Sequence, residues 1–286
     1  MFGISAAIYA SFFLGLSNGA LKKSYKDFAP SVAFFFDAIL GLFIWVPAAL
    51  FFGVNFSYLG EVFIFAILSA IMTEVLFFYA LSKGKLSVTT LLLNSYPIYT
   101  VIFSYFLNGE RLSLFESFYI LLTILGTALI FIPKKFSFNN FKRGEILWPI
   151  IAAIAVGLSD TLSKGIINRT HDFSFLFALA IVQLPVSYFY LKIEKQNPLK
   201  VIKTVRGNIE PYKNAIFGGL FNIIGTGLMW ISFTTLLASI AAPIVATSGV
   251  IGFILAVIFM NEKLNKRTLV ALFLVLVGIM GLSAAI

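Results

Sequence analysis

Apolar residues fill long stretches of this chain, without the one-sided periodicity of elements that face water. A helix needs about 20 mostly apolar residues to cross a hydrocarbon core of about 30 Å. Ten such stretches follow one another, at residues 2–21, 31–53, 62–82, 86–107, 112–132, 146–167, 173–193, 214–236, 238–260 and 264–286. Because they are apolar on every face, we expect membrane-spanning helices rather than barrel strands, whose residues alternate between apolar and polar.

The composition excludes a water-exposed globular domain. Hydrophobic residues make up 60% of the 286 positions and charged residues only 12%, against roughly 25% charged in soluble domains. The net charge of +9 does not indicate nucleic acid, because the basic residues lie between the apolar runs. The chain has no cysteine. We expect no cofactor and no metal, and as partners a small-molecule substrate, protons and membrane lipid, with a monomer or a loose dimer as the assembly.

The basic residues also predict an orientation. Eighteen of the 21 Lys and Arg residues fall in connections that follow odd-numbered runs, whereas the other side holds Arg111, Lys164 and Arg169. Positive loops stay in the cytoplasm. We therefore expect a cell-membrane protein with both chain ends outside.

The two halves of the chain look duplicated. Residues 15–18 (Gly-Leu-Ser-Asn) are echoed by residues 157–160 (Gly-Leu-Ser-Asp), and Lys22 by Lys164, at an offset of 142. Residues 110–112 match residues 262–264 at an offset of 152. Five runs in each half place the halves in opposite orientations, which is typical of secondary transporters. The sequence thus predicts an all-α polytopic membrane protein with ten transmembrane helices as a 5+5 inverted repeat, residues 1–135 and 136–286.

Several short motifs resemble the repeat of EamA-type transporters of the drug/metabolite transporter superfamily. They are Phe78-Tyr79-Ala80-Leu81, Pro97, Asn108-Gly109-Glu110-Arg111-Leu112 and Gly126, with a weaker second copy in Met260-Asn261-Glu262-Lys263-Leu264 and Gly278. Pro243 departs from the pattern, because the offset of 152 carries Pro97 onto Gly249. The resemblance implies a bundle around a central cavity lined by runs 1, 3, 4, 6, 8 and 9, and transport of small metabolites, often by export.

Glu74 is the strongest candidate for chemistry, since it lies near the middle of the third run. A carboxylate at that depth costs several kcal/mol unless it is protonated, paired or facing water. One interpretation is a group that couples transport to protons or binds a substrate amine. The other is a structural glutamate that pairs with a neighbouring helix. Asp37, early in the second run, is expected to pair with a lysine of the first loop and is not assigned to a site.

Asp160 and Lys164 lie four residues apart in the sixth run and share a helix face, as do Asn18 and Lys22 in the first. These pairs are either local ion pairs near the membrane edge or symmetry-related substrate contacts and gates. Gly15 and Gly157 begin matching small-residue faces, which close helix packing explains without function.

The remaining candidates are aromatic or uncharged polar residues. Freed carbonyls beside Pro97, where proline removes a backbone donor, are candidates for substrate contacts or for bending, and Pro243 is a second gate candidate. Ordinary interhelical hydrogen bonds are the competing explanation for the nearby polar side chains. As further substrate-binding candidates we name Tyr79, Asn94, Ser95, Asn222, Thr226, Trp230 and Thr247.

Three functional classes fit a polytopic chain. A secondary transporter is favoured by the apparent repeat, by isolated polar residues at membrane depth and by the absence of a G-x-x-x-x-G-K-[ST] motif. A channel, or a receptor or scaffold that transports nothing, is the alternative. An intramembrane enzyme is least favoured, because one His and no Cys leave no convergent catalytic set.

Overall fold

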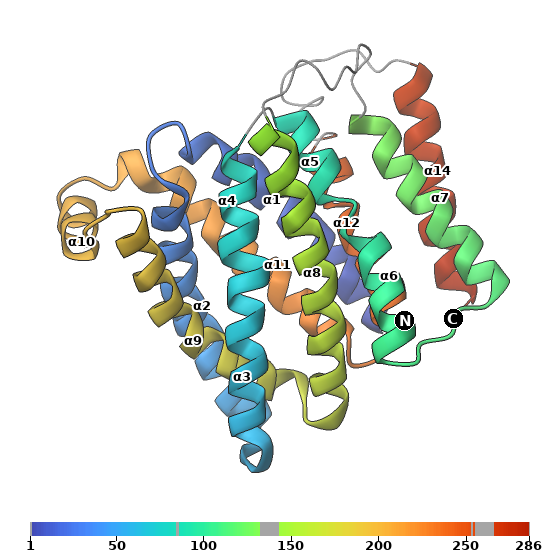
Figure 1. Cartoon of the computed structure of the whole chain (residues 1–286), viewed down its shortest axis with the longest axis horizontal. Helices are drawn as coiled ribbons and strands as arrows, with labels where there is room; N and C mark the ends of the chain where they lie inside the picture. Colours follow the sequence, from blue (N-terminus) through green and yellow to red (C-terminus); the bar gives the residue numbers. More distant parts are fainter. Residues whose placement is uncertain (1, 84–85, 132–142, 253, 255–265, 286) are drawn as a thin grey trace.

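The computed structural model describes residues 2–83, 86–131, 143–252, 254 and 266–285, and these are helical almost throughout (Figure 1). In chain order the α-helices are α1 (Phe2–Ser24), α2 (Pro30–Phe52), α3 (Leu59–Ser69), α4 (Leu76–Ser82), α5 (Leu86–Leu93), α6 (Tyr96–Leu107), α7 (Leu114–Phe131), α8 (Arg143–Arg169), α9 (Asp172–Ile193), α10 (Pro198–Gly207), α11 (Lys213–Ser232), α12 (Ala238–Ala246) and α14 (Lys266–Ala285). A π-helical segment, η2 (Ala70–Val75), joins α3 to α4, and two single 3-10 turns, Phe56–Tyr58 and Glu210–Tyr212, precede α3 and α11.

The predicted all-α polytopic membrane architecture is confirmed. Within the described residues, eight helices are long and apolar enough to cross a membrane. Two shorter apolar helices, Leu114–Ile130 and Ala238–Gly252, fall in the expected runs 112–132 and 238–260. Those two runs continue into residues outside the described part, so the tenfold crossing stays a prediction.

Helices from the two halves of the chain interlock. The largest contacts pair α1 with α11, α2 with α9, α6 with α8, and α7 with α14. Each pair joins one helix from before residue 132 to one from after residue 142. The bundle therefore forms a single packed unit, and both chain ends lie at the same end of it (Figure 1).

Two glycines allow helix backbones to touch in matching places. A Cβ on Gly15 of α1 would lie 2.6 Å from the carbonyl oxygen of Ser248, and a Cβ on Gly157 of α8 would lie 2.7 Å from the amide nitrogen of Thr100 on α6. Small residues permit such close approach between membrane helices. Gly15 and Gly157 therefore allow close helix packing, as expected.

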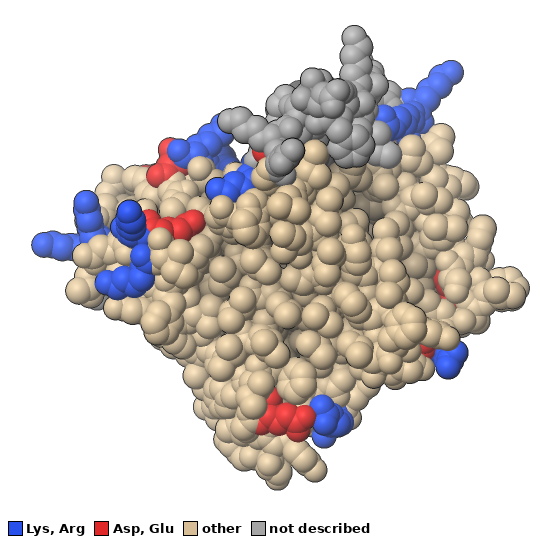
Figure 2. Space-filling model, viewed as in Figure 1, with Lys and Arg blue, Asp and Glu red and all other residues tan. Residues whose placement is uncertain are grey.

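Charged residues leave a broad uncharged band across the face of the molecule that Figure 2 shows. On the face in Figure 2, Lys and Arg gather along the upper edges, and a few charges lie at the lower edge. Tan residues cover the surface between them. Exposed side chains such as Phe43, Phe106 and Phe273 are 65–76% accessible, which suits contact with lipid.

Candidate functional site

A cavity of about 60 Å³ lies between helices that come from both halves of the bundle. Its lining comprises Leu14, Asn18, Thr73, Glu74, Phe77, Asn94, Tyr96, Val156, Asn222, Thr226, Met229, Trp230, Val245 and Ser248. These residues belong to the six expected runs 1, 3, 4, 6, 8 and 9. Small-molecule sites have volumes of roughly 300–1,000 Å³, so the cavity must widen before it can hold a metabolite.

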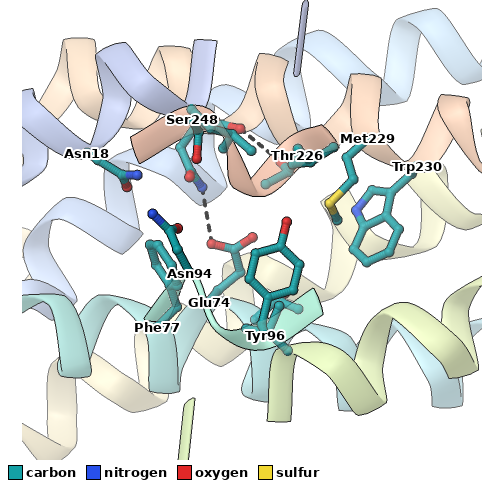
Figure 3. A pocket seen from close by; sticks show the side chains of 14 residues that line it. Asn18, Glu74, Phe77, Asn94, Tyr96, Thr226, Met229, Trp230 and Ser248 are labelled. Carbon is teal, nitrogen blue, oxygen red and sulfur yellow. Dashed lines mark hydrogen bonds between the residues drawn. The ribbon is translucent and has the colours of Figure 1, made fainter. Parts of the chain in front are cut away.

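Six of the predicted substrate-binding residues line this cavity: Asn18, Glu74, Asn94, Asn222, Thr226 and Trp230. Figure 3 shows Glu74 and Tyr96 directed into a common space, with Asn18 and Asn94 on one side of it and Met229 and Trp230 on the other. The cavity therefore has two amides beside Phe77 at one end, an acid near its middle, and Met229 and Trp230 at the other end.

Glu74 accepts a hydrogen bond from Asn222, which also lines the cavity. The side-chain nitrogen of Asn222 on α11 donates to Glu74 Oε2 at 3.2 Å and to Asp37 Oδ1 on α2 at 3.0 Å. Glu74 is 2% exposed and Asp37 is fully buried. The expectation that Asp37 pairs with a lysine of the first loop is wrong, because α2 turns it inward, toward α11.

The backbone around Glu74 departs from a regular α-helix. Residues Ala70–Val75 form a π-helical turn within the third expected run, which hydropathy alone reads as one continuous helix. A π turn inserts an extra residue and rotates the rest of the helix about its axis, and such turns are frequent at functional sites. Here the turn places both Thr73 and Glu74 on the cavity wall.

Two lining helices are broken at matching positions. The fourth run divides at Asn94 and Ser95 into α5 and α6, and the ninth divides at Thr247, after α12. Tyr96 and Ser248, which come directly after the breaks, both line the cavity. Pro97 therefore does not kink a continuous helix as expected: it lies in the first turn of α6, where its missing N–H costs nothing. Pro243 lies inside α12.

Three buried polar atoms in the lining have no hydrogen-bond partner among the described residues. They are Oδ1 of Asn18, Nδ2 of Asn94 and Nε1 of Trp230. Buried polar atoms are rarely left unpaired, because an unmet hydrogen bond costs about 1–3 kcal/mol. The cavity thus offers an acceptor and two donors beside a carboxyl group.

Four predicted substrate-binding residues do not line the cavity. Tyr79 packs edge-on against Trp148, with Lys83 over its ring. Ser95 donates to the carbonyl of Leu92. Asp160 is fully buried and accepts from Thr100. Thr247 bonds to Ser11, so its neighbour Ser248 faces the cavity instead.

Lys164 does not form the local ion pair considered with Asp160. Its ammonium group donates to the carbonyl of Phe233, at the end of α11. In the first half, the matching Lys22 donates to the carbonyl of Leu81 near the end of α4, at 2.8 Å. Because the last carbonyls of a helix lack intrahelical partners and carry partial negative charge, each lysine ties the first long helix of its half to the end of the third.

The motif glutamate Glu110 reinforces the contact near Lys164. It accepts hydrogen bonds from the amides of Ala238 and Ser239, both at 3.0 Å, and from the Ser239 hydroxyl. A carboxylate at a helix N-terminus satisfies free donors and interacts favourably with the helix dipole. Glu110 therefore fixes the start of α12 to the end of α6. The second copy of this motif, residues 260–264, lies outside the described residues.

The sequence profile of the EamA-like transporter family matches residues 1–132 and 143–284. This chain belongs to that family. The expected resemblance, including membership of the drug/metabolite transporter superfamily, is confirmed, and the chain belongs to a family of transporters rather than of enzymes.

Distant relatives carry transporter names. A pseudopaline exporter of Pseudomonas aeruginosa is 23% identical over 191 residues, which cover 65% of this chain and 66% of the exporter. A probable purine permease of Arabidopsis thaliana is 23% identical over 77% of this chain and 60% of the permease. An uncharacterized transporter of Archaeoglobus fulgidus is 22% identical over 98% of this chain and 96% of its own length.

A solved crystal structure shares the fold over the whole chain. It has a TM-score of 0.74 and 16% sequence identity, and the match covers 99% of this chain and 97% of the other. At that identity the likeness supports the fold alone. Together with the family match, it makes the central cavity the first place to look for a substrate.

Proposed function

We propose that this EamA-family protein is a secondary active transporter that exports small amphipathic metabolites, amino-acid-like or similar, by alternating access. The observation that carries the proposal is the cavity itself. A buried carboxyl group, Glu74, lies there with an aromatic wall and three polar atoms that have no partner among the described residues. In this proposal Glu74 binds a proton and the amine of the substrate in turn.

The lining supports a ligand with one basic group, further hydrogen-bonding groups and an apolar part. Glu74 would receive a cationic amine, Asn18 a donor, and Asn94 and Trp230 acceptors. The ring of Trp230 is held against Phe175 and Phe233, with centroids at 5.2 and 5.4 Å, so it offers a fixed aromatic wall. The direction of transport is proposed from the pseudopaline exporter among the relatives.

The wider arrangement is proposed on the same basis. Two five-helix repeats, residues 1–135 and 136–286, would rock against each other around the cavity. The excess of Lys and Arg along one end of the bundle favours that end as cytoplasmic (Figure 2), which would place both termini outside a cell membrane. The cavity lies within a single chain, so a monomer is sufficient, and a loose dimer would add nothing to the site.

Lys164 is proposed as part of the gate near the chain ends, with Pro97 and Pro243 in the broken helices that bend. Replacing Lys164 with Met removes its bond to the carbonyl of Phe233, a charge-assisted contact typically worth about 1.5–3 kcal/mol. Because the chain has no natural cysteine, a single Leu236→Cys reports on this end; Leu236 is 4% exposed. We expect its maleimide labelling to accelerate by about tenfold in Lys164→Met.

The matched control for this gate is Lys22→Met, which removes the equivalent contact in the other half. It should leave labelling of Leu236→Cys at the rate of the protein without either lysine substitution. Equal acceleration of labelling in both lysine variants would show general loosening of the bundle, and the proposal that Lys164 is part of the gate would then be wrong.

Ligand binding and then counterflow test the proposed function. The purified protein is heated in detergent with a panel of amines, amino acids, nucleobases and sugars, because a ligand that binds only the folded state raises its apparent stability. A compound that stabilises the protein is then assayed in proteoliposomes. Saturable uptake that is accelerated by unlabelled compound inside is the expected result. Uptake that neither saturates nor shows counterflow would indicate a channel, and binding without uptake a receptor.

A further inference from the structure

Asn222 holds two acids that come from different helices. Its side-chain nitrogen donates to Glu74 at 3.2 Å and to Asp37 at 3.0 Å, so one carboxyl oxygen of each acid lies beside the same amide. Glu74 lines the cavity, whereas Asp37 lies behind Asn222 and is not part of the lining. Gly219 of α11 allows this approach, since a Cβ there would lie 3.0 Å from the backbone nitrogen of Asp37.

The surroundings of this pair do not compensate two negative charges. The salt bridges within the described residues join Arg169 to Glu61, His171 to Asp172 and Lys213 to Glu210, so neither acid has a basic partner there. Like charges that are close together in a poorly solvated site cannot both ionise freely. At least one of the two carboxyl groups must therefore keep a proton unless a cation enters.

Among the described residues, the other titratable groups near the pair add no positive charge. Tyr25, just after α1, lies within electrostatic range of both acids, and it is also within range of Tyr190 on α9 and of Glu194 at the end of α9. From α11 the pair meets the neutral Asn222 and Gly219. The second oxygen of Asp37 is buried and has no partner among the described residues, which leaves an atom free to carry a proton.

The pair is also absent from the second half of the chain. The offset of 142 carries Asp37 onto Leu179, and the offset of 152 carries Glu74 onto Thr226. The lysine contacts, by contrast, occur in both halves. A feature needed only to build this duplicated bundle would be expected twice, so the pair serves the site rather than the fold.

We propose that Asp37 and Glu74 form a single coupled proton site, which carries two negative charges only when a cation occupies the cavity. This rests on the proposed function and deepens it by adding Asp37. When the substrate's ammonium group arrives, the O–H bond of the remaining protonated carboxyl group breaks, and its proton leaves through cavity water. One positive charge enters and one leaves, so charge balances in each half of the cycle.

An infrared titration of the neutral carboxyl band tests the coupling without any ligand. Two coupled acids lose their protons in two well-separated steps that belong to the pair. The spectrum of an Asp37→Asn, Glu74→Gln double variant is subtracted from that of the wild type at each pH. The difference is expected to show these two steps. Asp37→Asn and Glu74→Gln should each show one step, and each step should fall between the two steps of the wild type.

Asp160→Asn is the matched control, because Asp160 is a fully buried acid that contacts Thr100 rather than the pair. It should leave both steps in place. If Asp37→Asn removes one step and leaves the other at its wild-type pH, the two acids titrate independently and the proposal is wrong. Asparagine at position 37 keeps an oxygen that can accept from Asn222. Either single variant is enough to test the coupling, so the test still decides if the other one misfolds.

This test separates the pair from the transport proposal. Coupled steps in a protein that binds a compound but shows neither saturable uptake nor counterflow would retain the proton site and overturn the transporter. A protein that binds and transports a ligand but has independent steps would retain the transporter and overturn the role of Asp37.

Discussion

Glu74→Gln should abolish accumulation of substrate driven by a proton gradient. Gln can still accept from Asn222, but it neither releases a proton nor balances a cationic amine. The lost charged contact is worth roughly 1.5–3 kcal/mol, which lowers affinity for the ligand by about 10- to 150-fold. Both effects are measured with a compound from the stability panel, the first in proteoliposomes with an imposed pH difference and the second by titration in detergent.

Glu61→Gln is the control for this substitution. Glu61 lies in α3, one residue before the expected run that holds Glu74; it is partly exposed and pairs with Arg169 at 2.8 Å, away from the cavity. It should leave accumulation and affinity within about twofold of the wild type, since surface ion pairs contribute about 0–1 kcal/mol. Full proton-driven accumulation in Glu74→Gln would rule out Glu74 as the coupling group.

Gly157→Val should clearly destabilise the bundle. A Cβ at Gly157 would lie 2.7 Å from both the backbone nitrogen of Thr100 and the Cβ of Tyr99, so α8 and α6 must separate. Overpacking of this kind costs about 1–3 kcal/mol and occasionally more. We expect a clear loss of monodisperse protein in detergent and a lower unfolding temperature.

Gly19→Val tests whether that loss comes from helix contact. Gly19 lies on α1, and a Cβ there meets nothing within 4 Å. Valine is also a better helix former than glycine. Gly19→Val should therefore be neutral or slightly stabilising, and an equal loss in both variants would contradict the close-packing explanation.

Hydropathy was sufficient to predict most of the fold. Lipid and protein interior are both apolar, so a membrane helix can be identified from its length and composition. Hydropathy could not show where such helices break. The π turn at Ala70–Val75 and the breaks at Ser95 and Thr247 change the backbone within apolar runs, and they change which residues face the cavity.

The sequence predicted those site residues whose types are rare in the middle of an apolar run. Glu74 and Asn222 stand out because polar groups are costly at membrane depth, and both reach the cavity. Asp37 was missed because its partner is 185 positions away in the sequence, so no local pattern relates them. Tyr96 and Ser248 were missed as contacts because one residue decides which side of a helix break faces inward.

Proton release on ligand binding tests the central claim most directly. The purified protein is mixed with a stabilising compound in weakly buffered detergent, and the change in pH is recorded. If Glu74 exchanges a proton for the substrate's amine, the wild type and Glu61→Gln release protons in proportion to the ligand bound. Glu74→Gln, in which Asp37 alone can titrate, releases far fewer. Equal release from Glu74→Gln, at matched occupancy, would contradict the account.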